Sequence, residues 1–150
     1  MEKRATEKSP FGKLHHVGVL VKDMDKTIAL LKSLGIGPFQ EKVDTIHFKG
    51  LLHDKPEEWQ VRISNARMGD VQLELLQPCG GKSALQESLD STGEGLHHIG
   101  FLVDDLDGEI ARQTEQGAKI WTTAKNAAGS GFVYFEPTTL GGIAIEFRKL

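Results

Sequence analysis

One stretch of this chain occurs twice, 82 positions apart. The two copies are Leu14-His15-His16-Val17-Gly18-Val19-Leu20-Val21 and Leu96-His97-His98-Ile99-Gly100-Phe101-Leu102-Val103. Over the aligned ranges 14–36 and 96–118, 11 of 23 positions are identical. A second pair of segments repeats with an offset of 72, and these are Val71-Gln72-Leu73-Glu74 and Ile143-Ala144-Ile145-Glu146. Such internal repetition indicates two copies of one structural unit.

The length of the chain limits how these two units can be arranged. The chain has 150 residues, and a unit of about 70 residues buries too little surface to be stable alone. We therefore expect the two halves to share a core within one compact domain, and we expect a homodimer. The predicted parts are a polar tail at 1–12, a first unit at 13–79, a linker with a short helix at 80–95 and a second unit at 96–150.

Apolar periodicity predicts the same order of elements in each half. The first half is expected to contain a strand, a helix that begins at Asp23, and three further strands. The predicted strands of this half are 15–21, 39–48, 58–66 and 71–77, with a polar loop at 49–58. A linking helix at 83–89 follows, and the second half repeats the order with a strand at 97–103, a helix at 107–116 and strands at 118–123, 132–136 and 142–148. This pattern predicts an α+β fold.

The alternation of side chains along a strand divides these residues between two faces. Apolar residues such as Val19 and Phe101 are expected to face the helices. The opposite face then carries one histidine and one glutamate from each unit, namely His16, Glu74, His98 and Glu146. Two imidazoles and two carboxylates suit a divalent ion such as Zn, Fe, Ni, Co or Mn. We therefore predict a metal site made by these four residues of one chain.

The same alternation of side chains, which we call strand parity, predicts further residues on the metal-binding face. Arg62 is placed there as a group that could bind an anionic substrate. Tyr134 is its counterpart in the second unit, and Gln72 lies two residues before Glu74. These three are the predicted substrate-binding residues.

The β-α-β-β-β doublet and its motifs resemble the vicinal oxygen chelate superfamily. The matching motifs are Leu-His-His-Val-Gly and Leu-His-His-Ile-Gly at the start of each unit, and Glu-Leu-Leu-Gln-Pro and Gly-Gly-Ile-Ala-Ile-Glu at their ends. The resemblance covers about residues 13–149 and implies two tandem modules that form a curved mixed sheet with a metal-binding cup. Within the superfamily, the chain is most similar to the methylmalonyl-CoA epimerases. It departs from them on the strand before Glu74, where Gln60, Arg62 and Ser64 stand and a second catalytic carboxylate is absent.

The resemblance implies a metal-dependent isomerase or epimerase that moves a proton next to a thioester or ketone. Glu146 is expected to transfer the proton because Ala144 and Tyr134 make its surroundings less polar, whereas Glu74 is expected to act mainly as a ligand. Arg148 is expected to lie nearer the rim of the cup than Glu146. The alternatives are a glyoxalase I-type lyase, an extradiol-type dioxygenase and a non-catalytic ligand-binding or resistance protein. A fourth ligand, Glu74, disfavours the dioxygenase, and four intact ligands disfavour a purely binding role.

Composition restricts the partners of this chain. The net charge of −3 is not concentrated in a basic stripe, so nucleic acid is not an expected partner. No apolar run reaches the length of about 18–20 residues that spans a membrane. The single cysteine, Cys79, is typical of a reducing compartment, and we expect a cytoplasmic protein. The expected partner is a small molecule, either an acyl-CoA or another anionic compound.

Overall fold

The computed structural model describes residues 9–40, 42–138 and 141–150. Within these residues it contains eight strands and three helices. In chain order they are β1 (His16–Leu20), α1 (Met24–Ser33), β2 (Asp44–Leu52), β3 (Lys55–Met68), β4 (Val71–Gly81), α2 (Ala84–Ser91), β5 (Gly95–Leu102), α3 (Leu106–Glu115), β6 (Ile120–Lys125), β7 (Gly131–Phe135) and β8 (Ala144–Lys149). The predicted order of strand, helix and three strands therefore occurs twice, and the α+β assignment is confirmed.

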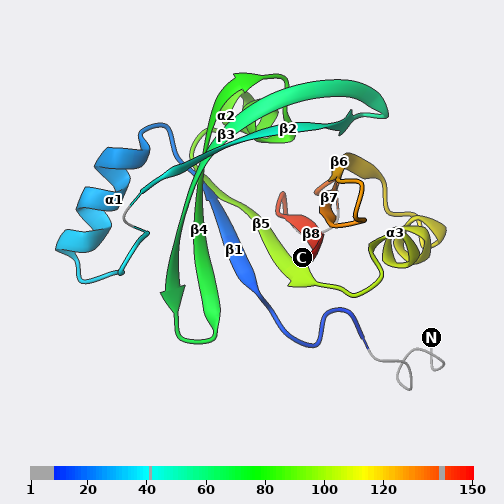
Figure 1. The fold of residues 1–150 in the computed structure, drawn as a ribbon, viewed down its shortest axis with the longest axis horizontal. Helices are drawn as coiled ribbons and strands as arrows, with labels where there is room; N and C mark the ends of the chain where they lie inside the picture. Colours follow the sequence, from blue (N-terminus) through cyan, green and yellow to red (C-terminus); the bar gives the residue numbers. More distant parts are fainter. Residues whose placement is uncertain (1–8, 41, 139–140) are drawn as a thin grey trace.

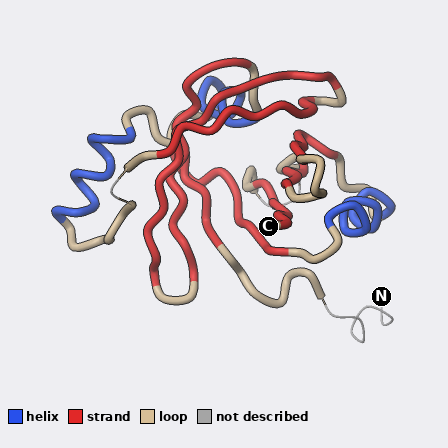
Figure 2. The backbone as a smooth tube through the Cα atoms, in the orientation of Figure 1, coloured by secondary structure: helices blue, strands red, loops and turns tan. Residues whose placement is uncertain are grey.

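The eight strands form one closed sheet in the order β1-β4-β3-β2-β6-β7-β8-β5. The first and last strands of each unit pair in parallel, as β1 with β4 and as β5 with β8. The two units meet at an antiparallel seam between β1 and β5, which lie side by side in the centre of Figure 1. A shorter seam between β2 and β6 closes the ring. The expected cup is thus the interior of a barrel to which both units contribute (Figure 2).

Two helices cover the outside of this barrel, one for each unit. Asp23 caps the start of α1 by accepting a hydrogen bond from the Lys26 amide, and Asp105 caps α3 in the same way through Gly108. These caps explain why the repeat retains an aspartate at this place, since a capping side chain satisfies an unpaired helix amide. Phe101 packs in the α3 cluster and Val19 packs against the α1 cluster, so the predicted helix-facing sides of β1 and β5 are confirmed.

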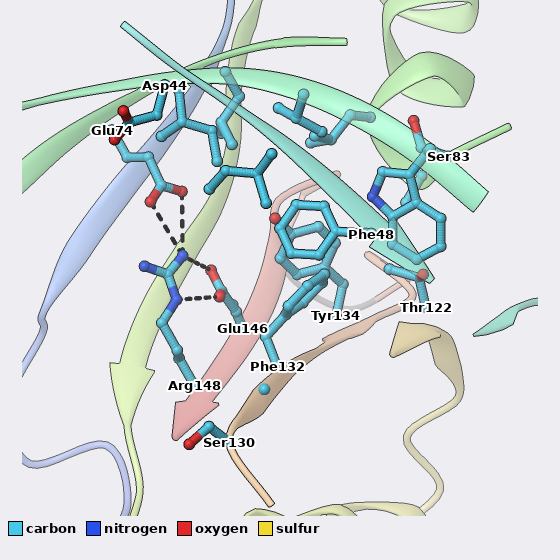
Figure 3. Close-up of a pocket in the computed structure, with 18 of the residues that line it drawn as sticks. Asp44, Phe48, Glu74, Ser83, Thr122, Ser130, Phe132, Tyr134, Glu146 and Arg148 are labelled. Carbon is cyan, nitrogen blue, oxygen red and sulfur yellow. Dashed lines mark hydrogen bonds and ion pairs between the residues drawn. The ribbon is translucent and has the colours of Figure 1, made fainter. Parts of the chain in front are cut away.

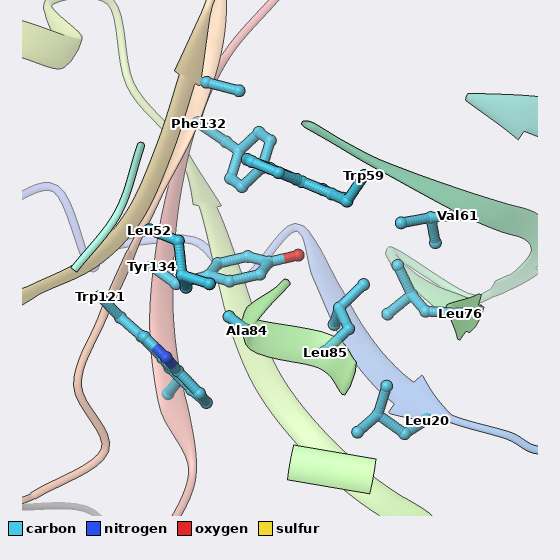
Figure 4. Packing of buried hydrophobic residues seen from close by; sticks show 12 residues of the cluster. Leu20, Leu52, Trp59, Val61, Leu76, Ala84, Leu85, Trp121, Phe132 and Tyr134 are labelled. Carbon is cyan, nitrogen blue, oxygen red and sulfur yellow. The ribbon is translucent and has the colours of Figure 1, made fainter. Parts of the chain in front are cut away.

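A third apolar cluster fills much of the barrel interior (Figure 4). Its members come from both units and include Leu20, Trp59, Val61, Leu76, Phe132 and Tyr134. Helix α2 contributes Ala84 and Leu85 to this cluster, so the linker also packs into the shared core. The interior and the helix-facing side of the sheet are therefore both apolar.

The prediction of a polar loop at 49–58 is wrong. This segment belongs to a long hairpin in which β2 and β3 pair from Asp44 opposite Ile63 to Leu52 opposite Lys55. His53 and Asp54 form the turn with φ values of 49° and 63°, as a tight two-residue hairpin turn requires. The segment reads as polar because much of the hairpin end is exposed. The remaining elements lie where they were predicted, with ends shifted by a few residues.

In the described part of the chain, no helix is both long enough and apolar enough to span a membrane.

Candidate metal centre and its pocket

The first and last strands of each unit bring four polar side chains to one point inside the barrel. His16 begins β1, and the parallel partner strand β4 places Glu74 beside Gly18. The second unit repeats the arrangement, with His98 on β5 and Glu146 beside Gly100 on β8. Because β1 and β5 run antiparallel at the seam, the two histidine–glutamate pairs face each other.

These four residues, which we call the quartet, lie close enough to bind one ion. One ligand atom from each residue lies within 4.8 Å of the others. Oε2 of Glu146 is 2.6 Å from Nε2 of His16 and 2.9 Å from Nε2 of His98. Oε1 of Glu74 is farther from the same two nitrogens, at 4.0 Å and 3.4 Å respectively. All four side chains are buried, so the structure brings the whole predicted metal set together within one chain.

The donor set of the quartet fits a divalent metal. Two imidazole nitrogens and two carboxylate oxygens suit Zn, Fe, Co, Ni or Mn, and two carboxylates balance the charge of the ion. Buried carboxylates are costly unless they are paired or coordinate a metal. The residues present therefore fit a metal ion, and their identity alone does not select one metal.

The glycine of each repeat makes room for the histidine of the other unit, a role that the sequence reasoning missed. Gly100 lies opposite His16 and Gly18 lies opposite His98 across the β1–β5 seam. A Cβ atom on Gly100 would overlap the His16 ring, and one on Gly18 would overlap the His98 ring. Both copies have a histidine followed two residues later by a glycine, and this shared spacing is the sequence signal for the contact.

The first histidine of each copy supports the second. Nδ1 of His15 is 2.8 Å from Nδ1 of His16, and Nδ1 of His97 is 2.9 Å from Nδ1 of His98. Each quartet histidine is thus held at Nδ1 while its Nε2 faces the other quartet residues. A hydrogen bond at one ring nitrogen fixes the tautomer and orientation of a metal-binding imidazole. His15 and His97 are therefore positioning residues.

Electrostatics favour ionised groups in the quartet. Burial alone would lower the pKa of His98, but the carboxylates of Glu146 and Glu74 raise it to about 9. Burial opposes ionisation of Glu146, yet Arg148 and His98 hold the pKa of this carboxyl well below its ordinary value. Burial lowers the pKa of His97 to about 3, and the neighbouring His98 adds to this effect, so His97 is neutral.

Arg148 is more exposed than the two glutamates, at 25% against 3% and 0%, as expected for a residue nearer the rim, and it contacts both of them. Its Nε donates to Oε1 of Glu146 at 2.8 Å, and its Nη2 donates to Oε2 of Glu74 at 3.1 Å. Figure 3 shows the guanidinium between the two carboxylates. The expectation that Glu146 has less polar surroundings than Glu74 is therefore wrong, because Arg148 makes its shortest hydrogen bond with Glu146.

A pocket opens from the quartet into the barrel. It has a volume of about 370 Å³. Glu74, Glu146 and Arg148 form its polar end, and Phe48, Phe132 and Tyr134 lie beside them in Figure 3. Further apolar lining residues include Ile46, Trp59, Val61, Ile63, Leu76 and Leu85. A concave, mostly apolar site with a few polar groups is typical of a small-molecule site.

The three predicted substrate-binding residues have different positions. Tyr134 lines the pocket and its ring lies 4.8 Å from the His98 ring. Gln72 shares the strand parity of Glu74 but is not among the residues that line the pocket. The prediction that Arg62 faces the cup is wrong, since its guanidinium donates to Asp25 at 3.1 Å and to Gln77 at 3.3 Å.

The reason for the error is the apolar interior of the barrel. On β3 the apolar residues Trp59, Val61 and Ile63 line the pocket, whereas the alternate residue Arg62 faces outward to α1. Apolar side chains predict the helix-facing side of a strand, but on β3 they face the interior of the barrel.

Known proteins resemble this chain along most of its length. The uncharacterized protein YqjC of Bacillus subtilis is 26% identical over 124 residues, which cover 77% of this chain and 89% of YqjC. The mitochondrial methylmalonyl-CoA epimerase of Bos taurus is 25% identical over 141 residues, covering 92% of this chain and 74% of the epimerase. A variant methylmalonyl-CoA epimerase of Streptomyces coelicolor, solved in complex with 2-nitronate-propionyl-CoA, has a TM-score of 0.61 and 22% identity, with 91% of this chain and 96% of that chain covered.

A family model with the description glyoxalase/bleomycin resistance protein/dioxygenase superfamily matches residues 15–135. This range includes both copies of the histidine repeat, three of the four quartet residues and most of the pocket wall. The fold, the repeated motifs and this match agree, and the chain belongs to the glyoxalase/bleomycin resistance protein/dioxygenase superfamily, also called the vicinal oxygen chelate superfamily.

Proposed function

We propose that this protein is a metal-dependent isomerase of the epimerase type, which transfers a proton at a carbon next to a thioester or ketone. The observation that carries the proposal is the buried quartet at the inner end of a pocket large enough for a small molecule. The curated relative from Bos taurus is a methylmalonyl-CoA epimerase, and the Streptomyces coelicolor structure holds an acyl-CoA analogue. Both support this class of reaction.

His16, Glu74, His98 and Glu146 would hold the ion. A divalent metal there supplies Lewis acidity toward a carbonyl oxygen of the substrate. The tyrosine and phenylalanine side chains of the wall exclude water from this end of the pocket, which strengthens electrostatic interactions within it. Proton transfer itself requires a side-chain base within reach of the substrate carbon.

The two quartet glutamates are the candidate bases, and their contacts differ. Glu146 lies within 2.9 Å of both histidine nitrogens, whereas the closest such contact of Glu74 is 3.4 Å. A carboxylate with longer contacts is easier to release from the ligand set. This asymmetry favours Glu74 as the group that moves the proton and Glu146 as the firmer ligand.

Epimerisation needs a second acid or base, because the proton leaves one face of the carbon and returns to the other. Of the described residues that line the pocket, Asp44 is the one carboxylate outside the quartet. Asp44 lies on β2, so it provides a candidate for the second group.

Exchange of solvent deuterium into acyl-CoA thioesters tests the reaction. Metal-supplied wild-type protein is incubated in D₂O with methylmalonyl-CoA, a panel of other acyl-CoA thioesters and a panel of ketones, and exchange is followed by mass spectrometry. We expect the wild-type protein to exchange deuterium into at least one of these substrates. Glu74→Gln should lose this exchange. Asp44→Asn should still exchange deuterium into one epimer but should no longer interconvert the two epimers. Arg62→Gln is the control, because Arg62 lies outside the pocket.

The outcomes separate the roles. If Glu146→Gln loses exchange while still binding metal, and Glu74→Gln keeps it, the roles of the two glutamates are reversed. If the wild-type protein exchanges no proton of any thioester or ketone tested, the proton-transfer function is wrong.

A further inference from the structure

Arg148 places a positive charge at the polar end of the pocket. The two glutamates of the quartet contribute two negative charges, which a divalent ion balances. Asp44 and Lys149 also line the pocket and carry opposite charges, so the guanidinium of Arg148 leaves one net positive charge among these side chains. Its side chain is 25% exposed and lines the pocket.

Arg148 can keep one hydrogen bond to each glutamate while the quartet binds an ion, but its Nη2 must move outward. This nitrogen lies 3.3 Å from Oε1 of Glu74, 3.3 Å from Oε2 of Glu146 and 3.4 Å from Nε2 of His16. The oxygens nearest the histidine nitrogens are Oε2 of Glu146 and Oε1 of Glu74. The shortest Arg148 hydrogen bonds to each glutamate go to the other oxygens, Oε1 of Glu146 and Oε2 of Glu74. Its second terminal nitrogen, Nη1, makes no hydrogen bond with any described residue, so this donor is available to a ligand.

The rest of the pocket favours a flat apolar group. The rings of Phe48 and Trp59 stack with centroids 5.7 Å apart, Phe48 meets Phe132 at 5.4 Å, and Phe132 meets Tyr134 at 5.0 Å. All four rings line the pocket. A volume of about 370 Å³ leaves space beyond what a methyl substituent would fill.

We propose that the substrate of this site is a singly charged acid with a second oxygen on the neighbouring carbon and a ring-sized apolar substituent. Its charged end lies beside Arg148 and the quartet, and its apolar group lies among Phe48, Trp59, Phe132 and Tyr134. This substrate class rests on the proposed function for the reaction. It takes the ketone case and not the thioester case, because an acyl-CoA carries several phosphate charges. Its binding can be measured without turnover.

Three small probes separate the two halves of the proposal. Mandelate has a carboxylate, a vicinal hydroxyl and a phenyl ring. Lactate keeps the two oxygen groups but replaces phenyl by methyl, and mandelamide keeps the ring but is uncharged. Binding of each to zinc-loaded protein is measured by isothermal titration calorimetry, and the zinc content of each protein is determined.

We expect wild-type protein to bind mandelate at least about tenfold more tightly than lactate, because the phenyl ring buries additional apolar surface. We also expect mandelate to bind at least about tenfold more tightly than mandelamide, since a charge-assisted hydrogen bond is stronger than a neutral one. Arg148→Gln should remove most of the preference for mandelate over mandelamide. Lys149→Gln, which removes the neighbouring positive charge that lines the same pocket, should retain it.

A second variant covers the case in which Arg148→Gln no longer holds zinc. Arg148→Lys keeps the charge without the fork of donors, and it should give an intermediate preference. Equal affinity of the wild-type protein for mandelate and lactate, or for mandelate and mandelamide, would overturn the proposed substrate class. If Arg148→Gln and Lys149→Gln lose the preference for mandelate over mandelamide to the same extent, the proposed role of Arg148 is wrong.

These outcomes are independent of the reaction. If mandelate binds in an Arg148-dependent way but no substrate exchanges deuterium, the proposed substrate class is supported and the proposed isomerase activity is refuted. If acyl-CoA thioesters exchange deuterium but the protein does not prefer mandelate, the proposed isomerase activity is supported and the proposed substrate class is refuted.

Discussion

Substitution of Gly100 by alanine should disable the quartet without touching any of its members. The added Cβ would lie 2.5 Å from Nδ1 of His16 and closer still to Nε2. An ordinary contact at this place needs 3.4–4 Å. The His16 ring must therefore retreat by roughly 1 Å or more, because contacts inside the van der Waals distance are strongly repulsive.

A shift of this size exceeds what metal coordination tolerates. Distances from a metal to its ligands hold to about ±0.2 Å. Loss of His16 as a ligand should weaken metal binding at least about 100-fold, which is the upper end of what changes to the outer shell of a metal site cost. Overpacking itself should cost about 1–3 kcal/mol of stability, so the variant should still fold.

Calorimetric titration of zinc into metal-free protein measures this effect, and circular dichroism checks the fold. The matched control is Gly80→Ala, which also lies on a strand of the sheet but whose Cβ would meet its nearest neighbour, Gln60, at 3.8 Å. The control should bind zinc with wild-type affinity. Wild-type zinc affinity in Gly100→Ala would refute the view that this glycine makes room for His16.

Four further predictions concern stability and protonation. Removal of metal with a chelator should lower the melting temperature in differential scanning calorimetry, because an ion that binds only the folded state stabilises it. Equal melting temperatures for the metal-free protein and the protein at saturating zinc would contradict the metal site. The pKa of His98 is raised to about 9 from 6.5, so its contribution to the stability of metal-free protein is fully present below pH 6.5 and is lost as the pH rises through 9. Zinc binding at pH 7.5 should correspondingly release about one proton from His98, as calorimetry in buffers of different ionisation enthalpy can measure, and His98→Gln should abolish this release. Phe101→Asp should unfold the chain, because an unpaired buried charge costs several kcal/mol and the total stability of a protein is about 5–15 kcal/mol. Leu102→Asp is the control and should fold, because this side chain is 40% exposed. A urea titration of both variants measures the difference.

The repeat allowed much of the fold and the quartet to be predicted from the sequence. Strand parity could be read on β1, β4, β5 and β8 because each strand occurs in two copies with the same polar position. Parity failed on β3, where the alternate apolar residues line the pocket and Arg62 bonds Asp25 outside it. A barrel with apolar packing on both sides of its wall gives no polarity difference that tells inside from outside.

Two features of the site depend on contacts between the units. The overlap between Gly100 and His16 follows from the register of β1 with β5, which joins strands far apart in the sequence. The position of Arg148 between Glu74 and Glu146 depends on the path of a long side chain. It also depends on the approach of side chains from β4 and β8, two strands that β1 and β5 separate in the closed sheet. Sequence parity placed Arg148 on the face of Glu146 but could not show that it reaches both glutamates.

The most direct test of the metal centre is the anomalous difference density of crystals of zinc-loaded protein, recorded at the zinc absorption edge. We expect one strong peak per chain at roughly 2.0–2.3 Å from His16, Glu74, His98 and Glu146, and no such peak in crystals of a His16→Ala variant treated in the same way. Absence of a peak at the quartet in the wild-type crystals, or a peak bound by other residues, would contradict the account.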